Sequence, residues 1–185
     1  PLQRAKKLPG TELSDEEHLW INAWDDFVVN LRKIHKGRRL PGFPIWADHW
    51  IDSSELKIPR GTPDWKQDFL RKNSQFYTEN RKFLDKWISK WEIYSDKFPP
   101  SRRKLEWQAQ DTPSLWDTVM HFRPSGIRAK KMTYLPALVA ITQTSIIGPL
   151  ERRLSTREAA RLQGLPDWFD FGDQRDAACL LYTSD

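Results

Sequence analysis

The 185-residue sequence has a single cysteine, Cys179, and only eight glycines, no two of which are closer than five residues. One cysteine excludes a disulfide framework and a cysteine-rich zinc site, and it indicates a reducing compartment. Loops that cradle a phosphate group need two or three neighbouring glycines, so the spacing argues against a nucleotide-cofactor loop. The four histidines are scattered, without the paired spacing of metal ligands. We therefore predict no catalytic, cofactor-binding or metal-binding residue in this chain.

Long hydrophobic runs are missing as well. The longest apolar stretch, residues 135–141, has the length of a strand, whereas a membrane span needs about 18 apolar residues. We expect no contact with a membrane and a cytoplasmic location. The sequence begins at Pro1 and has its only methionines at Met120 and Met132, from which we expect a piece of a longer protein.

Positive charge is in excess, and the excess is localised. Thirty Lys and Arg stand against twenty-five Asp and Glu, a formal net charge of +5. Residues 97–131 hold eight of the basic and three of the acidic residues, so this segment accounts for the whole excess. Its basic side chains alternate with polar ones such as Gln108 and Ser125, and the two kinds together suit phosphate anchoring and base-edge readout. On charge alone, a nucleic-acid interface and a solvated basic surface are equally good interpretations.

Three helices are predicted from their caps and their apolar periodicity. Residues 14–17 have capping-box spacing, and apolar residues then recur at helical intervals. Residues 62–64 (Thr-Pro-Asp) begin a long helical stretch to about residue 94, and Asn80 marks a point where it can break. A second capping box, at residues 155–158, begins a compact last helix.

We expect β structure in one region only. Residues 133–147 are β-prone, whereas residues 113–121 are interpreted as a short helix and residues 123–131 (RPSGIRAKK) as a basic loop. The predicted class is α+β: a mainly helical region, a small β segment around residues 127–147 and a short C-terminal helix.

The tryptophans form two groups, apart from one near the C-terminus. The first group lies on the apolar stripes of predicted helices, and we expect it in the core: Trp20, Trp24, Trp65, Trp87 and Trp91. The second group falls in loops or short elements, where stacking on nucleic-acid bases stays open as an alternative: Trp46, Trp50, Trp107 and Trp116.

Residues 152–166 (RRLSTREAARLQGLP) carry the most specific signal. They resemble the conserved segment that follows the target-recognition region of DNA (cytosine-5-)-methyltransferases. Ser155 stands where that family has Thr, Thr156 where it has Pro, and Leu165 where it has an aromatic residue. Because the capping box is kept, the helix is still expected to form. Residues 123–148 resemble the end of the family's target-recognition region, and residues 14–120 resemble the variable insertion of one bacterial subgroup.

The resemblance implies a catalysis whose motifs this sequence lacks. In the family, the target cytosine leaves the duplex, a cysteine of a Pro-Cys pair attacks it, a glutamate assists, and S-adenosylmethionine donates the methyl group. Residues 1–185 contain no Pro-Cys pair and no Gln-x-Arg-x-Arg motif, and residues 79–81 read Glu-Asn-Arg instead of the family's Glu-Asn-Val. The resemblance therefore implies a fragment of a larger α/β methyltransferase of a bacterium or phage. The fragment would be inactive alone.

Its implied task is sequence-specific recognition of double-stranded DNA for a catalytic domain of the same polypeptide, which would bind S-adenosylmethionine outside this chain. The residues expected to contact DNA are Arg102, Arg103, Lys104, Arg123, Arg128, Lys130, Lys131, Thr133 and Gln143. The residues expected to organise the fold of the conserved segment are Arg153, Arg157, Glu158, Arg161, Gln163 and Gly164.

The expected organisation has four segments. Residues 1–13 form a connector, residues 14–148 the target-recognition region, and residues 149–178 the conserved C-terminal segment. Residues 179–185 (CLLYTSD) resemble a translated sequencing adaptor, and we expect this tail to be non-native. Two alternatives stay open: a stand-alone nucleic-acid-binding module, which would explain the charge, and a helical protein-interaction domain, which would explain the tryptophan stripes.

Overall fold

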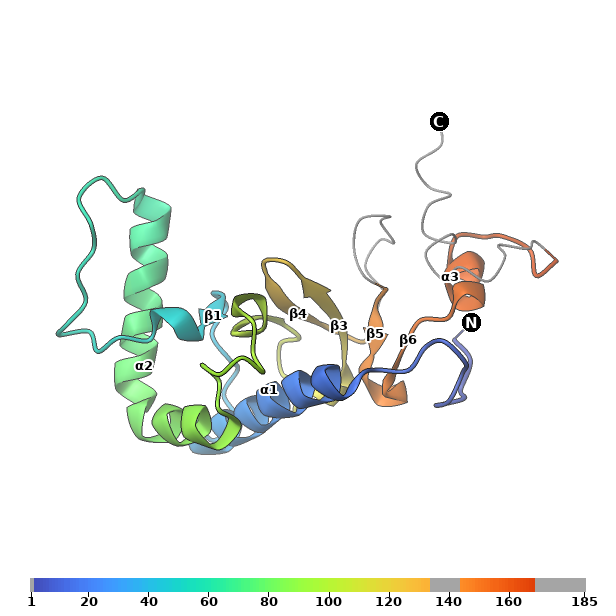
Figure 1. Ribbon diagram of the computed structural model, residues 1–185, viewed down its shortest axis with the longest axis horizontal. Coiled ribbons are helices and arrows are strands. Elements are labelled where there is room, and N and C mark those ends of the chain that lie inside the picture. The colour runs from blue at the N-terminus through green and yellow to red at the C-terminus, as the bar shows by residue number, and fades with distance from the viewer. Residues whose placement is uncertain (1, 134–143, 169–185) are drawn as a thin grey trace.

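The computed structural model describes residues 2–133 and 144–168, and in these ranges it combines three α-helices with one six-stranded sheet. The helices are α1 (Asp15–Ile34), α2 (Asp64–Trp91) and α3 (Thr156–Leu162). The strands are β1 (Ile45–Trp46), β2 (Lys104–Gln108), β3 (Thr118–Arg123), β4 (Gly126–Lys131), β5 (Ile146–Ile147) and β6 (Arg152–Arg153). Figure 1 shows an elongated molecule with α2 at one end, and α3 and the N-terminus at the other. The α+β class is confirmed.

Both predicted capping boxes are present. The Ser14 hydroxyl accepts a hydrogen bond from the backbone N–H of Glu17 at 3.2 Å, and the Glu17 carboxylate accepts from the Ser14 N–H at 3.1 Å. Ser155 and Glu158 exchange the same pair of bonds at the start of α3. Each box satisfies backbone donors that the first turn of a helix leaves unpaired, which is why both helices begin where the sequence predicts.

The long helix α2 runs unbroken for 28 residues, through the position where a break was expected. The Asn80 side chain lies inward there, donates to the Phe76 carbonyl at 2.9 Å and has its Oδ1 2.7 Å from His35 Nε2. The helix nevertheless changes direction along its length (Figure 1). Asn80 thus joins α2 to the C-terminal end of α1.

The sheet is larger than the small β segment that the sequence indicates. Its order is β1-β2-β4-β3-β5-β6, with β2 and β4 parallel and every other pair antiparallel. Two predictions are wrong. Residues 113–121 contain only a 3₁₀ turn, at Leu115–Asp117, before β3 begins, and residues 123–131 form the turn and second strand of the β3–β4 hairpin instead of a basic loop. Residues 118–122 are all buried, so β3 shows no alternation of apolar and polar residues. The prediction of a mainly helical region is therefore not confirmed for the described residues.

One face of the sheet packs on the helices and forms the main core. Leu105, Phe122 and Ile127 from the sheet lie in one cluster with Trp24 and Phe27 of α1. The buried indole N–H of Trp24 is satisfied by the Arg102 carbonyl at 2.8 Å, as a buried tryptophan requires. Among the residues described, no helix is long and apolar enough to cross a membrane.

Most tryptophans expected in the core are there, with one exception. Trp24 and Trp87 are almost fully buried, and Trp20 and Trp91 pack on the core partly buried. Trp65, by contrast, is 73% exposed. It lies in the first turn of α2, where the helix projects beyond the sheet, so the prediction that it belongs to the core is wrong.

Candidate nucleic-acid interface

The face of the sheet opposite the core is polar along β2, β4 and the end of β3, whereas toward β5 it carries a small buried apolar cluster of Val119, Ile147 and Leu154. Side chains alternate between the two faces along a strand, and paired residues on neighbouring strands share a face. Since Leu105, Phe122 and Ile127 lie in the core, the residues that flank them in β2, β3 and β4 lie on the other side. We call this set the polar sheet face: Lys104, Glu106, Gln108, His121, Arg123, Arg128 and Lys130.

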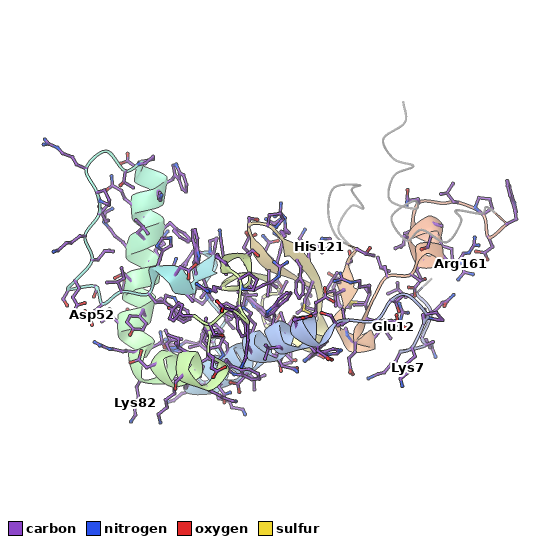
Figure 2. The ribbon with its side chains drawn as sticks, in the orientation of Figure 1. Lys7, Glu12, Asp52, Lys82, His121 and Arg161 are labelled. Atoms are coloured by element: carbon purple, nitrogen blue, oxygen red, sulfur yellow. The ribbon has the colours of Figure 1, made fainter. Side chains whose placement is uncertain are left out.

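His121 lies at the centre of this face, and its pKa depends on the charges around it. It is 9% exposed, and its Nε2 lies 2.8 Å from the Ser145 hydroxyl. Burial, and after it the charges of Lys130, Arg123 and Arg128, lower the pKa of His121 from 6.5 to about 4. In the β3–β4 register Arg128 pairs with His121, and Arg123 and Lys130 lie two residues along each strand on the same face, so three cations flank this imidazole. Figure 2 labels His121 in the sheet, well apart from Arg161 of α3.

Four cations and one carboxylate give the polar sheet face its charge. Arg128 is paired with Glu106 across β4 and β2, with Nη2 2.6 Å from Oε2. Lys104 has its ammonium 4.7 Å from the centre of the Trp46 ring. The carboxylate offsets one cation, so an anion approaching this face meets a net positive surface.

Other residues expected to contact DNA lie elsewhere. Arg102 is 8% exposed, with its guanidinium 4.7 Å from the Phe122 ring and donating to the Arg123 carbonyl at 3.0 Å. Arg103 donates to the Phe98 carbonyl and lies 3.3 Å from the Asp48 carboxylate. Both guanidinium groups hold loops together inside the fold. Of the neighbouring candidates Arg102, Arg103 and Lys104, only Lys104 is on the polar sheet face.

The last three candidates follow at or beyond the end of β4. Lys131 points to the other face and lies 3.5 Å from the Asp111 carboxylate. Thr133 is exposed. Gln143 lies outside the described residues, as do Cys179 and the tail at residues 179–185.

The conserved segment at residues 152–166 is built around a buried ion pair that sequence reasoning missed in part. Arg152 is 1% exposed and Glu158 is fully buried, and the guanidinium donates to both carboxylate oxygens at 2.8 and 2.9 Å. The other donors of Arg152 bind the carbonyl oxygens of Gln3, Ala5 and Arg153 at 2.8 to 2.9 Å. All five guanidinium N–H groups are therefore satisfied. We call this arrangement the Arg152 clamp.

The Arg152 clamp also sets the protonation of Glu158. Burial alone would raise its pKa, but hydrogen bonds from Arg152 and from the backbone N–H groups of Ser155 and Gln3 outweigh burial and lower it to about 2. The carboxylate is thus ionised at neutral pH. The clamp ties the N-terminal residues to α3, about 150 positions away along the chain. An arginine six residues before a capping-box glutamate was the signal available in the sequence.

The other residues of the segment also make contacts within the chain. Arg153 is ion-paired with Glu17 and donates to the Thr144 carbonyl at 3.1 Å. Arg161 forms a bidentate pair with Asp167 at 2.7 and 3.0 Å. Arg157, in the first turn of α3, is half-buried. The side-chain amide of Gln163 donates to the Ala159 carbonyl, and Gly164 has a positive φ of 78° just after α3. Contacts of this kind suit the fold-organising role expected for the segment.

Residues 2–133 and 144–168 contain no group of three or more side chains that could hold a metal ion. The fold and the site define an α+β unit with a cationic sheet face, held to its N-terminal segment by a buried ion pair. Such a face can bind phosphate groups.

Comparison with known proteins identifies the family. Residues 28–182 match the C-5 cytosine-specific DNA methylase family, and the chain belongs to it. The chain is 52% identical over 207 aligned positions to the Type II methyltransferase M.AluI of Cellulosimicrobium cellulans. The alignment covers 90% of this chain and 40% of that protein, so the chain spans less than half the length of this relative. No solved structure matched.

Proposed function

We propose that this chain is the DNA-recognition part of an S-adenosylmethionine-dependent DNA (cytosine-5-)-methyltransferase, and that the polar sheet face contacts the DNA. The observation that carries the proposal is the set of cations around His121. Arg123, Arg128 and Lys130 come from two strands: Arg128 pairs with His121 in the β3–β4 register, and Arg123 and Lys130 follow on the same face of the sheet. Cations spaced along adjacent strands can follow the phosphates of a duplex.

Within this proposal the residues divide by task. Lys104, Arg123 and Lys130 hold phosphates, while Gln108 and the partly neutralised Arg128 are placed to reach base edges. Thr133, Gln143 and Lys131 belong to the segment beyond β4, and we propose them as further contacts. The Arg152 clamp lies at the β6 edge of the sheet, and we propose that it does not read bases.

Catalysis is assigned to another part of the same polypeptide. The sequence has no Pro-Cys pair and no glycine-rich cofactor loop. We therefore expect the isolated chain to bind duplex DNA without methylating it. In the parent enzyme, acting in a bacterial cytoplasm as one half of a restriction-modification pair, S-adenosylmethionine would bind to the catalytic domain.

A salt titration of DNA binding tests the proposal. The wild-type chain should shift duplex DNA in a gel, with an affinity that falls steeply as salt rises. The variant Arg123→Gln/Lys130→Gln should lower the slope of log K against log salt by about 1.8, because each phosphate contact contributes about 0.9.

The matched control is Lys82→Gln/Lys86→Gln, which removes two exposed charges from α2. Figure 2 labels Lys82, which lies away from the sheet. This control should keep the wild-type slope. Equal slopes for the two double variants would overturn the assignment of the sheet face. A wild-type chain with no affinity for duplex DNA would favour the helical protein-interaction domain instead.

A further inference from the structure

A second candidate site lies beside the polar sheet face, between β1 and the first half of α2. It is a pocket of about 480 Å³, lined by Phe43, Trp46, Trp65, Phe69, Lys66 and Lys104, among others. We call it the aromatic pocket. Its size falls within the range of sites that hold small organic ligands, about 300 to 1,000 Å³.

The aromatic side chains of the pocket remain available to a ligand. Trp65 is 73% exposed, and Trp46 and Phe69 are half-buried with their ring centres 5.7 Å apart. A large exposed indole is unusual on a protein surface, since burying it would stabilise the fold. Trp65 therefore offers flat aromatic surface beside two rings, Trp46 and Phe69, that the fold itself holds in place through His49 and Lys104.

Positive charge surrounds these rings. The Lys104 ammonium lies 4.7 Å from the centre of the Trp46 ring and 5.7 Å from that of Phe69. The one acid at the rim, Asp68, is paired with Lys72 at 2.6 Å, which leaves the charges of Lys66 and Lys104 in excess. A ligand that fits must carry an aromatic plane and a negative charge close together.

The pocket is continuous with the polar sheet face. Lys104 pairs with Trp46 in the β1–β2 register, and it belongs both to the pocket and to the face. A nucleic-acid strand that leaves the face along β2 toward β1 would reach the aromatic rings next. This continuity points to the same ligand chemistry at both places.

We propose that the aromatic pocket binds an unpaired nucleotide of single-stranded DNA. The base stacks on Trp65 and Trp46, and the adjoining phosphate binds Lys104 and Lys66. A base inside a duplex has both of its faces covered by neighbouring bases, so stacking on a side chain requires an unpaired one. This proposal rests on the proposed function, because DNA bound by the polar sheet face would supply the unpaired nucleotide. It adds a second binding mode that duplex recognition does not require.

The test uses the 185-residue chain and two fluorescent oligonucleotides, an octathymidylate and an octamer of the same length in which every position is abasic. Both have the same phosphates, so they differ only in the bases offered for stacking. The wild-type chain should bind the octathymidylate about tenfold more tightly by fluorescence anisotropy.

The variant Trp65→Ala should lose about tenfold in affinity for the octathymidylate and nothing for the abasic octamer. The control Trp168→Ala removes another exposed tryptophan, 82% exposed in the segment after α3, and should leave both affinities unchanged. Equal affinities of the wild-type chain for the two oligonucleotides would overturn the proposal, and so would a Trp65→Ala effect of the same size on both. A peptide of alternating Glu and Phe that bound more tightly than octathymidylate and depended on Trp65 would assign the pocket to a protein partner.

The result separates this inference from the proposed function. Duplex binding that depends on Arg123 and Lys130, together with octathymidylate binding that ignores Trp65, would refute the aromatic pocket alone. Binding of octathymidylate that depends on Trp65, in a chain with no affinity for duplex DNA, would refute duplex recognition and keep the pocket.

Discussion

Glu158→Gln tests the Arg152 clamp most directly, because it removes the negative charge while nearly preserving the volume of the side chain. Glu158 is fully buried and accepts four hydrogen bonds, two from Arg152 and one each from the N–H groups of Gln3 and Ser155. In the variant, the Arg152 guanidinium stays buried opposite a neutral amide. An uncompensated charge in the interior is the main energetic consequence.

The magnitude follows from the burial of the pair. Breaking a buried ion pair by removing one partner costs about 3–5 kcal/mol, and a loss of that size lowers the melting temperature of a chain of this length by roughly 6–20 °C. Arg161→Gln is the matched control in the same segment, since its pair with Asp167 is exposed and should contribute far less than the buried pair. Thermal unfolding of both variants by circular dichroism measures the difference.

The pH dependence supplies the second half of this test. The pKa of Glu158 lies at about 2 in the folded chain, below its ordinary 4.5, so the clamp contributes fully above pH 4.5 and is lost as the pH falls toward 2. The stability gap between wild type and Glu158→Gln should shrink across that window. An unchanged melting temperature at pH 7, or a gap that stays constant down to pH 2, would refute the argument.

Three further predictions concern the sheet and the first helix. The folded-state pKa of His121, about 4, lies below its ordinary 6.5, so wild-type stability in urea should fall between pH 6.5 and 4, and His121→Gln should lack this loss. Gly148→Ala places a methyl group 2.3 Å from the Trp116 carbonyl oxygen and should lower the free energy of unfolding, measured by urea denaturation, by about 1–3 kcal/mol. Gly42→Ala, with open space around the added methyl group, should lower it far less. Ser14→Ala removes the cap of α1 and should cost about 1 kcal/mol in the same assay, and an unchanged midpoint would contradict the role of the cap.

Local signals predicted the helices well. The capping boxes at residues 14–17 and 155–158 involve partners three residues apart, and both are present as expected. The start of α2 after residues 62–64 depends equally on adjacent residues. Such features form with little help from the rest of the fold, so a sequence pattern is enough to find them.

The sheet depends on pairings between distant residues. Strand β3 is buried on both faces, so its residues lack the alternation that marks a half-buried strand, and neighbouring residues alone do not distinguish it from a helix. The parallel pairing of β2 with β4 requires a crossover through β3. Neither the pairing nor its register can be derived from a window of neighbouring residues.

The sequence by itself determined two things about this protein: the family, through residues 152–166, and the segment that carries the excess charge, residues 97–131. The tertiary structure alone decided what each charge does. Arg102 is turned inward against aromatic rings, whereas Arg123, Arg128 and Lys130 share one face of the sheet with His121. Likewise, Arg152 donates hydrogen bonds to a buried carboxylate and to three carbonyl groups. The reason is that composition counts charges, while burial and strand register, which depend on contacts across the whole chain, determine whether a guanidinium faces solvent or the core.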